Sequence, residues 1–232
     1  TGQQPSLGFS IKSQLGSPST LLNAGETTNF IYKIDKRLFS TQDINDINSL
    51  FIKRGEKLSR DIKGRIKAIY ERKAKLSFVN TQKQIFSNNL ILIDSLLPQI
   101  LASVLLQFAS SNYSSLEDLV KITEDENPLA FDTTNKHLFY HYKIKRFLTD
   151  VALGMMPSKV WTGEYDATGG YLIVKEDGDI LCYHIYNKNE FENYLLTNTK
   201  LETASTSKHK FGEIYEENNE LYFKLNLQIR FK

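Results

Sequence analysis

The stretch GFSIKSQLGSPSTLLNAGETTNFIYKI, residues 8–34, begins and ends with a strand-like alternation. In residues 7–13 apolar side chains alternate with small polar ones and with Lys12, and residues 29–34 alternate in the same way. A period of two residues is typical of a β-strand with one buried face. Residues 15–28 between them are rich in Ser, Thr, Asn and Gly, which indicates a loop. This stretch therefore predicts two strands joined by a long polar loop.

Helical periodicity dominates the middle of the chain. Apolar residues recur at helical spacing in residues 41–75, 81–109, 115–122 and 133–153, with a short predicted strand at 76–80. The segment 81–109 is apolar nearly all round, so we expect a buried central helix. Polar residues and a proline, Asp94 and Pro98 among them, interrupt its apolar run, which argues against a membrane span.

The last third of the chain is rich in strand patterns. Residues 171–175 and 179–185 flank Asp177-Gly178, a strong hairpin signal. A short helix is expected at 189–196, and a second hairpin at 214–231 is centred on Asn218-Asn219. The fold class is therefore α/β, with a helical middle section and a hairpin-rich C-terminal part. We expect one region over residues 1–232, divided into sections 1–80, 81–156 and 157–232.

Composition limits the possible functions. With 232 residues, 41% hydrophobic and 24% charged, the chain has the composition of a globular protein with a sizeable core. A net charge of +2 creates no global field for a polyanion, so any such site must be local. Cys182 is the only cysteine, which excludes an intrachain disulfide and a cysteine-cluster zinc site and fits a reducing cytosol. No signal peptide or membrane span is visible, so no membrane partner is expected.

The tripeptide Ser10-Ile11-Lys12 places Ser10 and Lys12 on the same face of the first strand. Metal-dependent phosphodiesterases need an acid and a lysine in this arrangement. The acid holds a hard cation through oxygen, and the lysine acts on the attacking water and on the charge that develops at the phosphate. A structural lysine on an edge strand would show the same pattern, so the spacing alone does not decide between the two.

Longer stretches of the sequence help to decide between a catalytic and a structural Lys12. They are KSQLGS at 12–17, TLLNA at 20–24 and TNF at 28–30, with GGYLIVKEDGDILCYHIYN at 169–187 and KFGEIYEENNELYFKLNLQIRF at 210–231. With these strings the chain resembles the HpaII family of type II restriction endonucleases along most of its length. The resemblance implies the PD-(D/E)xK nuclease core, a mixed β-sheet flanked by helices. It further implies Mg²⁺-dependent hydrolysis of double-stranded DNA at a short palindrome, CCGG for the HpaII type.

The resemblance also implies partners and a location. A palindrome is read by two-fold symmetry, so a homodimer on DNA is expected. A cognate DNA methyltransferase in the same system and a bacterial cytoplasmic location are also implied.

The resemblance makes Lys12 the catalytic lysine and puts Ser10 where the general motif has Asp or Glu. Ser10 offers only a neutral oxygen, and residues 1–25 contain no acid. A metal-binding Asp is therefore expected upstream of Thr1, with these residues as the C-terminal part of a longer chain, or on another element. Glu26 is a possible substitute, although a solvated loop acid would look the same. The alternative function is a catalytically inactive DNA-binding relative, which the serine at position 10 favours.

Two polar segments are candidate DNA contacts. Hydroxyl and amide side chains suit phosphate oxygens and base edges, and Lys and His side chains donate to phosphates or to guanine. The alternatives are turn chemistry for the first segment and a solvated loop for the second. The candidates are Ser13, Gln14, Asn23, Thr28 and Asn29 in the first segment, and Lys208, His209 and Lys210 in the second.

Overall fold

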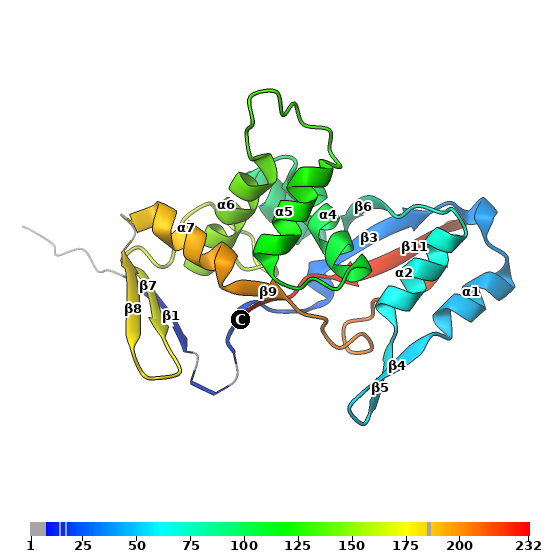
Figure 1. Ribbon diagram of the computed structural model, residues 1–232, viewed down its shortest axis with the longest axis horizontal. Coiled ribbons are helices and arrows are strands. Elements are labelled where there is room, and N and C mark those ends of the chain that lie inside the picture. Colours follow the sequence, from blue (N-terminus) through cyan, green and yellow to red (C-terminus); the bar gives the residue numbers. More distant parts are fainter. Residues whose placement is uncertain (1–7, 14, 17, 185–186) are drawn as a thin grey trace, which may run out of the picture.

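The computed structural model describes residues 8–13, 15–16, 18–184 and 187–232 of the chain (Figure 1). Helices and strands are mixed along the sequence, as an α/β protein requires. The described strands are β1 (Phe9–Ser13), β2 (Thr20–Leu22), β3 (Asn29–Ile34), β4 (Phe51–Arg54), β5 (Lys57–Arg60), β6 (Ser77–Thr81), β7 (Gly170–Val174), β8 (Ile180–His184), β9 (Thr199–Leu201), β10 (Ile214–Glu217), β11 (Glu220–Asn226) and β12 (Ile229–Phe231). The described α-helices are α1 (Thr41–Asn48), α2 (Ile62–Glu71), α3 (Gln84–Ile93), α4 (Leu97–Ser110), α5 (Leu116–Glu126), α6 (Phe139–Leu153) and α7 (Lys188–Thr197).

The strands form four small sheets, with the orders β1-β7-β8, β10-β11-β3-β6, β2-β12-β9 and β4-β5. The first sheet is mixed, because β1 pairs with β7 in parallel and β7 pairs with β8 antiparallel. The helices α3 and α4 pack on the four-stranded sheet, and α5 and α6 lie beside α4 (Figure 1). The predicted α/β class, with a mixed sheet and a helical middle section, is confirmed.

The main core lies between the four-stranded sheet and α4, which packs on β6 and β11. The alternating side chains Phe30 and Tyr32 of β3 and Phe223 of β11 are fully buried there. Even the one polar atom in this group is satisfied, because the Tyr32 hydroxyl donates to the carbonyl of Ala102 in α4 at 2.8 Å. Strand and helix are thus joined by packing and by one buried hydrogen bond.

The predicted C-terminal hairpin forms around Asn218 and Asn219, which both have positive φ values, 50° and 61°. Two left-handed residues in succession match the right-handed twist of the two strands. The predicted alternation also continues to the C-terminus, with alternate side chains buried from Leu221 to Phe231. The chain nevertheless changes sheets after Asn226, because β11 pairs with β3 while β12 pairs with β2 and β9.

The predicted helix over 81–109 is wrong in one respect, because it is two helices. The chain bends by 108° between α3 and α4. Asp94 ends the first helix, and its side chain accepts from the Leu96 amide at 2.9 Å. Pro98 then occupies the first turn of α4, where the missing N–H of a proline is tolerated. In the described part of the chain no single helix is long and apolar enough to cross a membrane, although α3 and α4 together have the length and composition.

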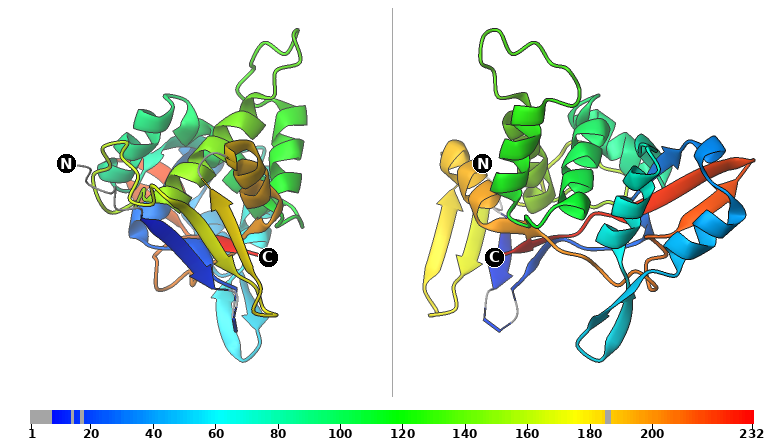
Figure 2. Two further views of the ribbon diagram at one scale, coloured as in Figure 1. Left: turned by 90° about the vertical axis from the view of Figure 1, so that its left-hand side faces the viewer. Right: turned by 45° about the vertical axis from the view of Figure 1, so that its right-hand side comes forward.

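The predicted helix over 41–75 is wrong in its middle. The chain forms α1, then the antiparallel hairpin β4-β5, then α2. Gly55 has a φ of 60° in the turn, a conformation that favours glycine, and it interrupts the helical pattern there. This hairpin protrudes from the body on the side opposite α5, as does the turn of β7-β8 (Figures 1 and 2).

Candidate functional site

An open pocket of about 600 Å³ lies beside β1. One wall is β1 with the loop that follows β2, and the other is the segment 151–158 at and after the end of α6. Ser10 and Lys12 both line this pocket, as their shared strand face predicts. The opposite face of β1 is open to solvent, with Phe9 41% and Ile11 63% exposed. Ser10 and Lys12 therefore face the pocket, whereas Ile11 faces outward and Phe9 is exposed at the border of the pocket.

Lys12 is half-buried in this wall. Its Nζ donates to the carbonyl of Thr20, at the start of β2, at 3.3 Å. Burial lowers the pKa of Lys12, because a desolvated ammonium is less stable than a solvated one. Lys12 therefore has a shifted pKa, a fixed position and access to a pocket, a combination found at functional lysines.

Asp166 lines the same pocket, and sequence reasoning missed it. It lies four residues before β7, and the parallel pairing of β7 with β1 brings it to Gly8. The Gly169 amide donates to the Gly8 carbonyl at 2.7 Å, which holds the two segments together. The one sequence signal for Asp166 is that it is an acidic residue shortly before a predicted strand. Nothing local in the sequence indicates that β7 pairs with a strand more than 150 residues earlier.

Gly8 lets these segments approach closely. A Cβ atom at this position would lie 2.4 Å from the Asp166 carbonyl oxygen, far inside van der Waals contact. Gly154 meets Asp166 from the other side, where its Cβ would lie 3.2 Å from Oδ2 of the carboxylate. Two glycines thus make room for Asp166 at the edge of the pocket.

Glu26 has a different setting. Its Oε1 forms an ion pair with Lys210 Nζ at 2.8 Å, and its Oε2 accepts from Gln82 Nε2 at 3.0 Å. The hydrogen bond from Lys210 lowers the pKa of Glu26, and Glu26 in turn raises the pKa of Lys210. Across the described residues there is no cluster of three or more His, Cys, Asp or Glu side chains suited to a metal ion.

Thr28 and Asn29 are buried rather than exposed, at 1% and 0%. Asn29 Nδ2 donates to Gln82 Oε1 at 2.9 Å and to the His209 carbonyl at 2.8 Å. Asn226 Nδ2 donates to Asn29 Oδ1 at 2.7 Å and to the Gly25 carbonyl at 2.7 Å. In this arrangement Thr28 and Asn29 do not reach the surface. Asn29 instead connects the loop after β2 to the segment around His209.

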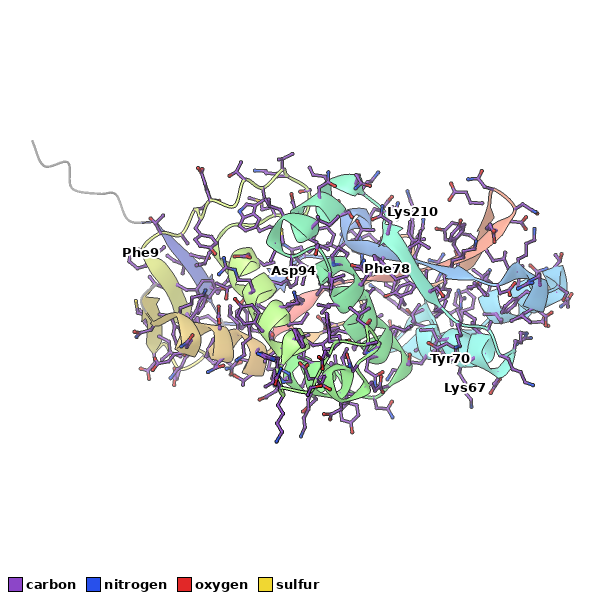
Figure 3. All side chains as sticks on the ribbon, turned by 90° about the horizontal axis from the view of Figure 1, so that it is seen from above. Phe9, Lys67, Tyr70, Phe78, Asp94 and Lys210 are labelled. Atoms are coloured by element: carbon purple, nitrogen blue, oxygen red, sulfur yellow. The ribbon has the colours of Figure 1, made fainter. Side chains whose placement is uncertain are left out.

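The remaining predicted contacts differ in exposure. Asn23 is exposed and lines the pocket, and Ser13 is exposed at the end of β1. Lys208 and Lys210 are exposed, while His209 is partly buried, and this burial lowers its pKa, with the nearby Lys208 charge adding to the effect. Gln14 lies outside the described residues. Lys210 lies between Phe9 and Tyr70 along the molecule (Figure 3), so the second segment is some way from β1.

Comparisons with known proteins identify the family of this chain. The family model described as HpaII restriction endonuclease matches residues 1–231. The chain is 52% identical over 231 residues to the type II restriction enzyme HpaII of Haemophilus parainfluenzae, with 100% of this chain and 62% of that enzyme covered. The chain thus spans about three-fifths of the length of this relative. No solved structure matches significantly. Because the family model covers nearly the whole chain, the protein belongs to the HpaII restriction endonuclease family.

Proposed function

We propose that this protein is a type II restriction endonuclease that hydrolyses phosphodiester bonds of double-stranded DNA at a short palindrome, CCGG. The observation that carries the proposal is the half-buried Lys12 beside Ser10 in an open pocket. The 52% identity to a type II restriction enzyme supports the same reaction. Double-stranded DNA is the substrate, and a cognate methyltransferase would protect the host DNA.

The donors in the pocket fit Mg²⁺. This ion is usually held by one or two carboxylates together with substrate phosphates, and it keeps several waters. Asp166 offers a carboxylate, and Ser10 and Asn23 offer neutral oxygens in the same pocket. When bound, Mg²⁺ supplies Lewis acidity at the scissile phosphate. A further Asp upstream of Thr1 stays a prediction. Glu26 is the weaker candidate, because Lys210 and Gln82 occupy both of its oxygens.

Lys12 acts on the attacking water in this proposal. Because burial lowers the pKa of Lys12, its neutral amine forms at lower pH than that of an exposed lysine. Nζ then accepts a proton as the water oxygen bonds to phosphorus and the bond from phosphorus to the 3′ oxygen breaks. The resulting ammonium offsets the negative charge on the phosphate oxygens. Thr20, through its carbonyl, keeps the Lys12 side chain directed along the pocket.

The exposed polar residues beside the pocket are the proposed DNA contacts. Asn23 is exposed in the pocket, and Ser13 is exposed at the end of β1. Lys208 and Lys210 are exposed on the second segment. Thr28 and Asn29 serve instead as positioning residues, because both are buried and Asn29 holds the backbone at His209. Gln14 stays a candidate contact because it lies in the string KSQLGS at 12–17.

The catalytic assignment is tested with Lys12→Ala and Asp166→Asn in the full-length protein. We expect Lys12→Ala to abolish cleavage of a plasmid with a single CCGG site while specific binding stays within roughly tenfold, because Lys12 serves the transition state. We expect Asp166→Asn to weaken Mg²⁺ or Mn²⁺ binding, measured by calorimetry with and without the duplex. Lys121→Ala on α5, an exposed lysine, is the matched control.

Two results would contradict the assignment. If Lys12→Ala keeps more than a tenth of wild-type cleavage, Lys12 is not catalytic. If wild-type protein binds a CCGG duplex in a salt-dependent way but never cuts it with Mg²⁺, the inactive DNA-binding relative is the better description. The serine at position 10, in place of an acid, would then be the natural explanation.

A further inference from the structure

The hairpin β4-β5 has no role in the site described above. It forms a two-stranded sheet by itself among the described strands, and it protrudes from the body (Figures 1 and 2). An isolated two-stranded hairpin is marginally stable in water. A protruding hairpin of this kind therefore needs an anchor, and its free end is available to a partner.

The anchor consists of two arginines. Arg65 of α2 is fully buried, and its guanidinium donates to the carbonyl of Leu50 at 3.1 Å, to that of Gly212 at 2.6 Å and to that of Asn48. It also lies over the ring of Phe51 at the base of the hairpin, 5.1 Å from the ring centroid. A buried guanidinium is costly unless it is hydrogen-bonded, and each of the three nitrogens of Arg65 donates to a backbone carbonyl. These hydrogen bonds hold the base of the hairpin.

Arg60, the last residue of β5, attaches the hairpin to the segment that carries Lys208 and Lys210. Its Nη1 donates to the carbonyls of Thr206 at 2.8 Å and Phe211 at 2.7 Å, and its Nη2 pairs with Glu213 at 2.7 Å. Both arginines therefore hold the backbone of residues 206–212 against the hairpin base. The hairpin and this proposed DNA-binding segment form one unit.

The free end of the hairpin is basic. Residues 53–57, KRGEK, contain three basic residues and one acidic residue, a formal charge of +2, which equals that of the whole chain. Lys53 and Lys57 are exposed, and neither ammonium has a carboxylate within 4.0 Å among the described side chains. Leu58, opposite Lys53 on the paired strand, is 66% exposed. Leu58 is therefore mostly uncovered by the described residues and lies beside two lysines that have no carboxylate partner among them.

We propose that the β4-β5 hairpin is a DNA-binding arm, with Lys53 and Lys57 on backbone phosphates and Leu58 against the sugars or bases of a groove. The proposal rests on the proposed function, because it names duplex DNA as the partner. Charge complementarity favours this partner, since phosphates of a duplex follow one another closely along each strand. The arm lies toward the end of the molecule away from β1 (Figure 1), so it contacts DNA that flanks the base pairs at the pocket.

The experiment compares Lys53→Ala/Lys57→Ala with Lys121→Ala/Lys159→Ala in the full-length protein. The second pair removes the same charge from two exposed lysines, Lys121 on α5 and Lys159 in the loop after α6. Binding to a long CCGG duplex is measured without divalent metal as a function of salt, and hydroxyl-radical footprints are recorded. We expect the arm variant to lower the slope of log K against log salt by about 1.8, which corresponds to two phosphate contacts. It also loses protection on the flank of the site, while the control pair changes neither.

A third variant distinguishes the apolar contact of the arm from its charge. Leu58→Ser should weaken binding without changing the salt slope, because it removes an apolar contact and no charge. An arm variant that binds with the wild-type slope and footprint would overturn the proposal, as would an equal effect of the control pair. The readout is binding, so a wild-type protein that binds but does not cut refutes the proposed endonuclease activity and leaves the arm supported. A wild-type protein that binds no duplex refutes both.

Discussion

Gly8 determines how closely β1 can approach Asp166. Its carbonyl accepts from Gly169, and its missing side chain leaves room for the Asp166 carbonyl oxygen, 2.4 Å from where a Cβ would lie. A gap this small cannot hold a methyl group, so one of the two segments must move. The candidate catalytic lysine lies four residues further along the same strand. The geometry of the pocket therefore depends on a residue that carries no functional group.

At this scale we expect Gly8→Ala to lower the free energy of unfolding by about 1–3 kcal/mol, as overpacking does. We expect it to reduce cleavage more than binding, because it displaces β1 and Asp166 relative to each other. Thermal unfolding and single-turnover cleavage would measure the two effects. Gly25→Ala is the matched control, since Gly25 lines the same pocket and its nearest Cβ contact would be 3.9 Å away. Equal behaviour of the two variants would contradict the steric argument.

At the scale of elements, the segment 206–212 links the parts of the proposed DNA-binding surface. Asn29 of β3 holds the backbone at His209, and Arg60 of β5 holds it at Thr206 and Phe211. Lys210 is tied to Glu26 by an ion pair, while Lys208 is exposed. The loop after β2, this segment and the β4-β5 arm are therefore connected by partly buried hydrogen bonds and an ion pair, even though they are distant in sequence.

Replacing Lys208, His209 and Lys210 together with Ala should weaken DNA binding and reduce the salt slope by up to about two to three phosphate contacts. If one of these side chains reads guanine, its single variant should also lose about 1–3 kcal/mol of discrimination against a changed base pair. Titrations of CCGG and altered duplexes at several salt concentrations give both values. Lys121→Ala/Lys159→Ala is again the charge-matched control. A salt slope equal to that of wild type would make this segment an ordinary solvated loop.

At the scale of the whole molecule, the two protruding hairpins lie on the side opposite α5, with the segment 206–212 between them (Figure 1). The helices α3 and α4 pack on the four-stranded sheet, whereas α5 contacts β9 and α6 contacts β2 and β7. The proposed contacts with DNA therefore come from strands and loops on one side, while the helices build the core. One such surface per chain matches half of a palindrome.

A palindromic site is read by two-fold symmetry, so we expect two copies of the full-length protein on each CCGG duplex. Mass photometry or sedimentation of the complex at low protein concentration would measure the stoichiometry. A duplex with only half of the palindrome serves as the control and should bind one copy with lower affinity. A single copy on the intact palindrome, with full cleavage of both strands, would contradict the homodimer.

The sequence by itself determined the elements whose signals are local. The alternation in residues 29–34 predicted β3 with its bounds, the two asparagines at 218 and 219 predicted the last hairpin, and helical spacing predicted most of α6 and α7. Short strings such as KSQLGS indicated the family, and the period of a strand placed Ser10 and Lys12 on one face. These results follow because backbone preferences and side-chain periodicity act over a few residues.

Only the tertiary structure decided which distant segments meet. Asp166 reaches the pocket because β7 pairs in parallel with β1. Parallel strands are not joined by a tight hairpin turn, so no local sequence signal indicates their pairing. Thr28 and Asn29 looked like surface residues, but the four-stranded sheet buries them. The β4-β5 hairpin forms where a helix was predicted, and buried Arg65 and partly buried Arg60 hold its base through contacts with segments distant in sequence.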